Sequence, residues 1–147
     1  MKVGAIAYNL TKNSLKVCLV RSKNQIHSLN LPEGIANLNE DSARAALRVL
    51  YEQTGLHGKV IYTSNLFLRT FINYEMENLV YIMIEVNTEK DHLSEYDQNK
   101  HCFLTFEEAL NKRLNKNSRK VIMELAKFKG VLNDHDFPSW ITEPPFA

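Results

Sequence analysis

Short stretches of apolar residues, some continuous and some alternating with polar ones, predict β-strands along the first third of the chain. KVGAIAYNL, from Lys2, and LKVCLVRS, from Leu15, read as two strands with the turn residues TKNS between them. We therefore expect a hairpin across residues 11–14. A shorter strand, IHSLNLPEG, should end at Pro32 and Gly34, because both residue types disfavour continued strand pairing.

The segment after this strand has the period of an α-helix. Spacing of i, i+3, i+4, i+7 predicts a core-facing stripe of Ala43, Ala46, Leu47 and Leu50. Asn39 is expected to cap the N-terminus of this helix, because its side chain can accept from the first free N–H groups. Gly55 is expected to end it, because glycine adopts the left-handed conformation without strain.

The remaining residues predict more strands and two further helices. KVIYTSNLFLRTFI and NLVYIMIEV are rich in β-branched and aromatic residues, and the second is apolar enough for the centre of a sheet. HCFLTF is a short strand, after which Thr105 and Glu108 form a capping box for a helix. A last helix is expected from near Ser118 to Gly130. Strands, helix, strands and helix in this order predict an α+β fold, an α/β/α sandwich with a mixed sheet between helices.

The composition is that of one ordinary globular domain. The 147 residues are 44% hydrophobic and 24% charged, and no repeat or linker divides them. Residues 1–130 are expected to form the domain, and 131–147 an irregular tail packed on it. The net charge of +1 gives no field that favours nucleic acid or membrane as a partner. Cys18 and Cys102 should remain thiols in the cytoplasm, since the N-terminus lacks a signal-peptide core.

Candidate chemistry gathers at the first predicted helix. On a helical wheel, Glu52 points away from the apolar stripe. Ala45, Val49 and Gln53 fall on a flank towards one exposed side. The loop from Gly34 should fold over the start of this helix, and loop carbonyls with helix carboxylates make an all-oxygen site of the kind that Mg²⁺ prefers.

The same stretch resembles the Nudix box, whose pattern is G-x5-E-x7-R-E-U-x-E-E-x-G-U with U a bulky aliphatic residue. Seven of the nine defined positions match, namely Gly34, Glu40, Arg48, Leu50, Glu52, Gly55 and Leu56. The hairpin before the box and the strands and helix after it also suit the Nudix fold. The order of elements after the box is similar to hydrolases of diphosphoinositol polyphosphates and diadenosine polyphosphates.

This resemblance implies a hydrolase that cleaves a phosphoanhydride of a nucleoside diphosphate derivative, such as a dinucleoside polyphosphate, with Mg²⁺ or Mn²⁺. The residues expected to hold the metal are Gly34, Glu52 and Gln53. The residues expected to serve the structure of the box are Glu40, Arg48 and Gly55. Its ligand would be a small nucleotide; a homodimer is left open.

Three departures from the family pattern affect charge at this site. Val49 and Gln53 stand where the family has Glu, and Glu33 stands where related sequences often have Lys. A missing acid could come from Glu95 or Asp97, in the loop after the predicted central strand, and the other candidates are Glu75 and Glu77. Basic residues that could meet substrate phosphates are Arg21, Lys23 and Arg69.

The alternative is a Nudix domain that has lost catalysis and binds a nucleotide or a protein partner without turnover. Removal of a positioned general base typically lowers a rate by about 10²–10⁴-fold. Loss of metal carboxylates also weakens ion binding, because Mg²⁺ gives up its waters reluctantly. The sequence therefore identifies a fold more firmly than an activity, and the enzyme hypothesis depends on Glu52.

Overall fold

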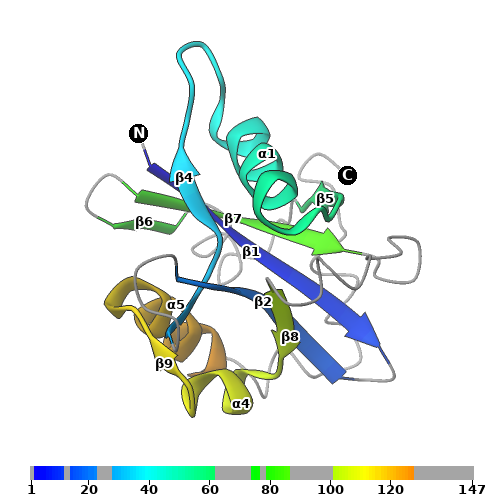
Figure 1. The fold of residues 1–147 in the computed structure, drawn as a ribbon, viewed down its shortest axis with the longest axis vertical. Coiled ribbons are helices and arrows are strands. Elements are labelled where there is room, and N and C mark those ends of the chain that lie inside the picture. The colour runs from blue at the N-terminus through cyan, green and yellow to red at the C-terminus, as the bar shows by residue number, and fades with distance from the viewer. Residues whose placement is uncertain are drawn as a thin grey trace.

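The computed structural model describes residues 2–11, 14–22, 28–61, 74–76, 79–86 and 101–127, which form a mixed sheet with helices on both faces (Figure 1). In chain order the strands are β1 (Lys2–Thr11), β2 (Ser14–Arg21), β3 (Ser28–Asn30), β4 (Glu33–Ile35), β5 (Gly58–Val60), β6 (Tyr74–Met76), β7 (Leu79–Val86), β8 (His101–Leu104) and β9 (Arg113–Leu114). The helices are α1 (Ser42–Thr54), α4 (Phe106–Leu110) and α5 (Lys116–Lys127). The predicted α+β fold class is confirmed.

β1 and β7 lie at the centre of the sheet and run parallel to each other. β1 also pairs with β2 in the predicted hairpin, with Thr11 opposite Ser14. β7 pairs on its other side with β5 and β6, so the apolar run that predicted a central strand is confirmed. Because both strands are covered on two faces, neither shows a regular apolar and polar alternation.

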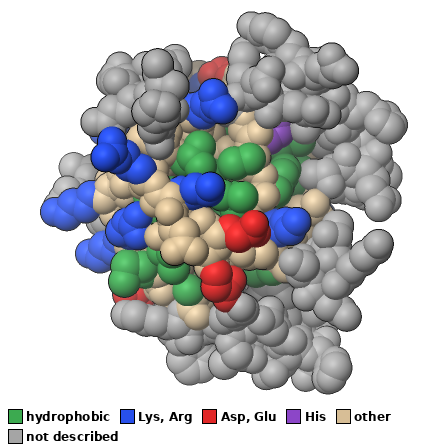
Figure 2. All heavy atoms as spheres, turned by 60° about the horizontal axis from the view of Figure 1, so that its bottom comes forward, with side chains coloured by type: hydrophobic (Ala, Val, Ile, Leu, Met, Phe, Trp, Pro, Cys, Tyr) green, Lys and Arg blue, Asp and Glu red, His purple; other side chains and the backbone are tan. Residues whose placement is uncertain are grey.

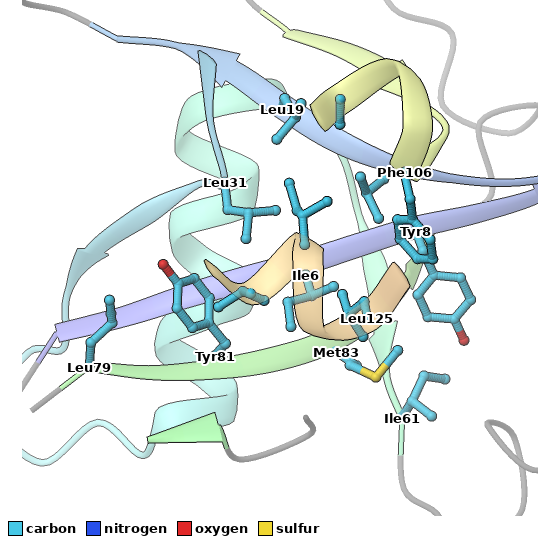
Figure 3. Close-up of a cluster of buried hydrophobic side chains, with 14 residues drawn as sticks. Ile6, Tyr8, Leu19, Leu31, Ile61, Leu79, Tyr81, Met83, Phe106 and Leu125 are labelled. Atoms are coloured by element: carbon cyan, nitrogen blue, oxygen red, sulfur yellow. The ribbon is translucent and has the colours of Figure 1, made fainter. Parts of the chain in front are cut away.

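Alternate residues of β1 supply two separate hydrophobic cores, since successive side chains point to opposite faces of a strand. Ile6 and Tyr8 face the first core, which lies between the sheet and α4 and α5 (Figure 3). Ala5 and Ala7 face the second, where α1 packs on the sheet. Small residues on that side let α1 approach closely.

β4 is a strand that the sequence did not predict. Pro32 and Gly34 were expected to end pairing, yet the Pro32 carbonyl accepts from the Ala5 N–H at 2.8 Å. Gly34 then lies opposite Val3 in an antiparallel ladder with β1. Proline lacks only the donor, so its carbonyl can still hold the chain at the edge of a sheet. The start of the box is therefore fixed to β1.

The N-terminus of α1 differs from the prediction, and its C-terminus agrees with it. Asp41 is the N-cap, and its carboxylate accepts from the Arg44 N–H at 2.8 Å. The predicted cap, Asn39, instead has a φ of 68° in the turn before the helix. Asparagine tolerates this left-handed conformation better than most residues. Gly55 ends the helix with a φ of 76°, as expected.

The buried face of α1 is displaced from the predicted stripe, since Ala43 and Leu47 are only partly buried. Ala46 and Leu50 are buried as expected, but Ala45 and Val49 are also only 0% and 2% exposed. The wheel placed these two on an exposed flank, which is wrong. β4 crosses beside the helix and covers that flank, as the packing of Val49 against Gly34 shows.

The C-terminal elements follow the prediction with one addition. The capping box of α4 is confirmed, with Thr105 and Glu108 bonded reciprocally. α5 begins at Lys116, close to the expected Ser118, and it is preceded by the short strand β9, which was not predicted. The expected helix stop at Gly130 and the tail 131–147 lie outside the described residues. Within the described part, no helix is long and apolar enough to cross a membrane.

Candidate active site on the box helix

Arg48, in the middle of α1, is the centre of an ion-pair network with Glu40 and Glu52. Its Nε and Nη2 atoms donate to the two carboxylate oxygens of Glu40, each at 2.9 Å. Nη1 donates to Glu52 Oε1 at 3.1 Å, and Nη2 also donates to the Ile35 carbonyl at 2.7 Å. A planar guanidinium suits such a paired contact with a carboxylate. Arg48 therefore ties the helix to the loop that precedes it.

Glu40 braces the same loop from the other side. Its carboxylate accepts from the Asn37 N–H at 2.9 Å as well as from Arg48. The Arg48 hydrogen bonds, followed by the Asn37 N–H, lower the pKa of Glu40 to about 2. Glu40 is thus ionised at neutral pH, and its carboxylate holds the loop before α1 through the hydrogen bonds from Arg48 and Asn37.

Glu52 is the accessible carboxylate of this helix. Its side chain is 58% exposed, against 27% for Arg48, and their contact has i, i+4 spacing. The ion pair holds one carboxylate oxygen towards Arg48 and leaves most of the group open to solvent. Glu52 can therefore meet a ligand without a change in the fold.

Val49 occupies a closed apolar slot. It packs with Val3 and Ala45, and its side chain lies against the backbone of Gly34. A Cβ built on Gly34 would come within 2.6 Å of Val49 Cγ2. Position 49 therefore contributes to packing and offers no ligand atom.

Gln53 is half-buried and uses its amide to hold β4. Its Nε2 atom donates to the Glu33 carbonyl at 2.7 Å. The partner is a carbonyl oxygen, so only the amide nitrogen can face it. The Oε1 atom of Gln53 is the atom that remains for a ligand.

Glu33 has a role that sequence reasoning missed. The sequence predicts only that Glu33 adds negative charge to the site, but its carboxylate accepts a short hydrogen bond from the Tyr81 hydroxyl. Tyr81 is fully buried in the first core, and the edge of its ring lies against Gly4. The two partners are 48 positions apart in the chain, so no local pattern could have paired them.

These donors do not fit a divalent ion that is resident in the free protein. Among the residues that the structure describes, no group of three or more His, Cys, Asp or Glu is arranged to hold a metal. Of the described carboxylates, Glu52 is the one available on this side of α1, and Arg48 already compensates part of its charge. Gln53 adds a neutral oxygen, and Gly34 lies in the β4 ladder with β1.

The predicted phosphate-binding residues are only partly placed. Arg21 is exposed at the end of β2, where it pairs with Leu29 of β3. Burial raises the pKa of the nearby Cys102 thiol, and the cations of Lys112 and Arg21 partly oppose this. Figure 2 shows Lys and Arg side chains gathered on the left, the side on which α5 and β9 lie in Figure 1. Lys23, Arg69, Glu95 and Asp97 lie outside the described residues.

Comparison with known proteins agrees with this architecture. The sequence profile of the NUDIX domain matches residues 1–125. No curated protein sequence matches the chain.

Solved structures with the same fold include a C. elegans Ap4A hydrolase, at 17% identity and a TM-score of 0.59, with 89% of this chain and 96% of that chain covered. A Nudix hydrolase from M. smegmatis, RenU, matches at 12% identity and a TM-score of 0.61 over 92% of this chain and 89% of that one. Shewanella oneidensis NrtR, solved with a 27mer DNA, matches at 14% identity and a TM-score of 0.57 over 90% of this chain but 63% of its own. The profile match covers most of the sequence, and the resemblance of the box is confirmed: the chain belongs to the NUDIX domain family.

Proposed function

We propose that this protein is a divergent Nudix-type hydrolase that cleaves a phosphoanhydride of a nucleoside diphosphate derivative, such as a dinucleoside polyphosphate, in the cytoplasm. The observation that carries the proposal is the exposed Glu52 carboxylate, held by Arg48 on a braced helix. A side chain that a rigid scaffold already holds in one orientation loses less conformational entropy when it binds a ligand. Family membership supplies the reaction class.

Nudix hydrolases generally use divalent metals, and here a Mg²⁺ or Mn²⁺ ion would be held only in the complex with substrate. Phosphate oxygens would supply most of its ligands and charge, and the Glu52 carboxylate would complete them, with Gln53 Oε1 and the Gly34 carbonyl assisting. Bound in this way, the ion would neutralise charge on the phosphoanhydride. A single protein carboxylate is better suited to a metal site shared with substrate phosphates than to a metal site in the free protein.

The remaining parts of the site would come from segments beyond the described residues. Asp97 or Glu95 would supply the acid that is missing from the box, as the base that takes a proton from the attacking water. Lys23 and Arg69, with the exposed Arg21, would contact substrate phosphates.

A turnover assay tests this proposal. A panel of nucleoside diphosphate derivatives and dinucleoside polyphosphates is incubated with Mg²⁺ or Mn²⁺, and released phosphorylated products are measured for the native chain, Glu52→Ala and Glu52→Gln. We expect turnover of at least one substrate and a loss of about 10²-fold or more in both variants, because the metal would lose its protein carboxylate. Equal rates in the native chain and Glu52→Ala on every substrate would refute it.

The second candidate is a domain that binds a nucleotide or a protein partner without turnover. It is favoured by Val49 and Gln53, whose side chains pack and tether where the family has metal carboxylates. Binding of a non-hydrolysable dinucleoside polyphosphate, measured by calorimetry with and without Mg²⁺, separates the two. Equal affinity in both conditions, together with no turnover, would favour this candidate over the hydrolase.

A further inference from the structure

We infer that Gln53 is a positioning residue: it clamps β4 to α1 and thereby keeps the Glu33 carboxylate on the Tyr81 hydroxyl. Gln53 donates to the Glu33 carbonyl at 2.7 Å, and the side chain of the same Glu33 accepts from Tyr81. One residue of β4 therefore connects the box helix to the central strand β7. This inference concerns the architecture of the box and does not depend on turnover.

The two contacts of Glu33 lie on different sides of β4. Gly34 faces α1, where its backbone rests on Val49. Since neighbouring residues of a strand point to opposite faces, the Glu33 side chain faces away from α1, towards the core that contains Tyr81. Its carbonyl, however, lies within reach of Gln53. β4 is held from both faces at one position, so a shift on the α1 side should reach Tyr81.

The chemistry of the clamp requires an amide at position 53. The acceptor is a carbonyl oxygen, and a carboxylate in place of the amide would set oxygen against oxygen and lose the donor. The Glu of the family pattern would thus damage this contact, and a metal would not be there to compensate. Gln53 is therefore a departure from the family pattern that suits the Glu33 backbone carbonyl beside it.

Tyr81 gives the inference its second support. Its ring is fully buried, so its O–H group needs a partner inside the protein, and Glu33 supplies a carboxylate acceptor. A Cβ on Gly4 would come within 2.4 Å of Tyr81 Cδ1, so the glycine lets the ring lie directly against β1. The ring is fixed by packing, and the position of the Glu33 carboxylate decides whether the bond forms.

The test is carbon NMR of the protein labelled with ¹³C at the tyrosine Cζ atom, whose shift reports hydrogen bonding of the hydroxyl. The chain has six tyrosines, and Tyr81→Phe identifies the signal of Tyr81. Glu33→Ala gives the signal without the carboxylate. Gln53→Met, which keeps the volume without the donor, and Gln53→Glu are compared with Glu52→Ala, a truncation of the adjacent exposed residue.

We expect the Tyr81 signal to move towards its Glu33→Ala position in both Gln53 variants and to stay at its native position in Glu52→Ala. General loss of stability does not produce this pattern, because all spectra are recorded well below the unfolding transition. An unchanged Tyr81 signal in Gln53→Met would overturn the inference. An equal movement of the Tyr81 signal in Glu52→Ala would also overturn it. Failure of Gln53→Met to fold would overturn it as well, because the loss of one hydrogen bond should not unfold the protein.

Discussion

Gly34 lies directly against Val49, so that a Cβ on the glycine would come within 2.6 Å of Val49 Cγ2. The neighbouring strand β1 fixes the backbone of Gly34 through its pairing with Val3. A methyl group added there cannot move away without disturbing the sheet. The box glycine is therefore required in this chain by packing on the residue at position 49.

Gly34→Ala should destabilise the fold by about 1–3 kcal/mol, the usual cost of an overpacked core. Val49→Ala should cost a similar amount through the cavity it leaves. The double variant should be more stable than the sum of the two changes predicts, because the smaller side chain makes room for the new methyl. Urea unfolding of all four proteins measures this coupling, and additive losses would show that the two residues do not share the space.

Val49→Glu should destabilise the protein by roughly 3 kcal/mol or more, because it places an unpaired carboxylate in a slot lined by Val3 and Ala45. The matched control is Tyr51→Glu, which puts the same charge on the exposed face of α1. Thermal unfolding compares the two. A Val49→Glu variant that is as stable as the native chain, and that gains affinity for Mn²⁺, would mean that this side chain can turn out into the site.

The hydrogen bonds of Glu40 with Arg48 and Asn37 should make the stability of the protein depend on pH. The pKa of Glu40 is lowered from an ordinary 4.5 to about 2 by the Arg48 and Asn37 hydrogen bonds. A carboxyl whose pKa is lower in the folded state than in the unfolded state stabilises the fold at pH values above its unfolded-state pKa. This stabilisation is lost as the pH falls through its folded-state pKa. The melting temperature of Glu40→Gln should therefore fall below that of the native chain near neutral pH. The two should converge between about pH 5 and pH 2; a gap that does not change with pH would contradict the ion pair.

Asn39 should respond to backbone substitutions in opposite directions. Its φ of 68° lies in the left-handed region, where glycine is unstrained and a β-branched residue is not. Asn39→Gly should be neutral or stabilising by up to about 1 kcal/mol, and Asn39→Val should destabilise by about 1–2 kcal/mol. Denaturant midpoints measure both. Equal stability of the two variants would contradict the positive φ.

Local pattern predicted the elements whose signals lie within a few residues. The hairpin at Thr11, the Gly55 helix end and the Thr105 capping box all depend on adjacent residues, and all three are confirmed. The box pattern, which is also local, identified the family.

What the sequence could not supply depends on contacts between distant segments. The strand β4 exists because β1 pairs with it, and that pairing covers the flank of α1 where Val49 lies. Burial at position 49 could not be read from a wheel, which treats a helix as packed on one side. The bond between Glu33 and Tyr81 likewise joins residues that only the folded sheet brings together.

Helix α1 offers one accessible carboxylate, Glu52, so the described residues form no resident site for a divalent metal. Titration of the free protein with Mn²⁺, with the unbound ion followed by electron paramagnetic resonance, tests it most directly. We predict a dissociation constant for Mn²⁺ of roughly millimolar or weaker, and a similar value for Glu52→Ala. The reason is that one carboxylate, already paired with Arg48, cannot displace the waters coordinated to the ion. Stoichiometric binding in the micromolar range that disappears in Glu52→Ala would contradict the account.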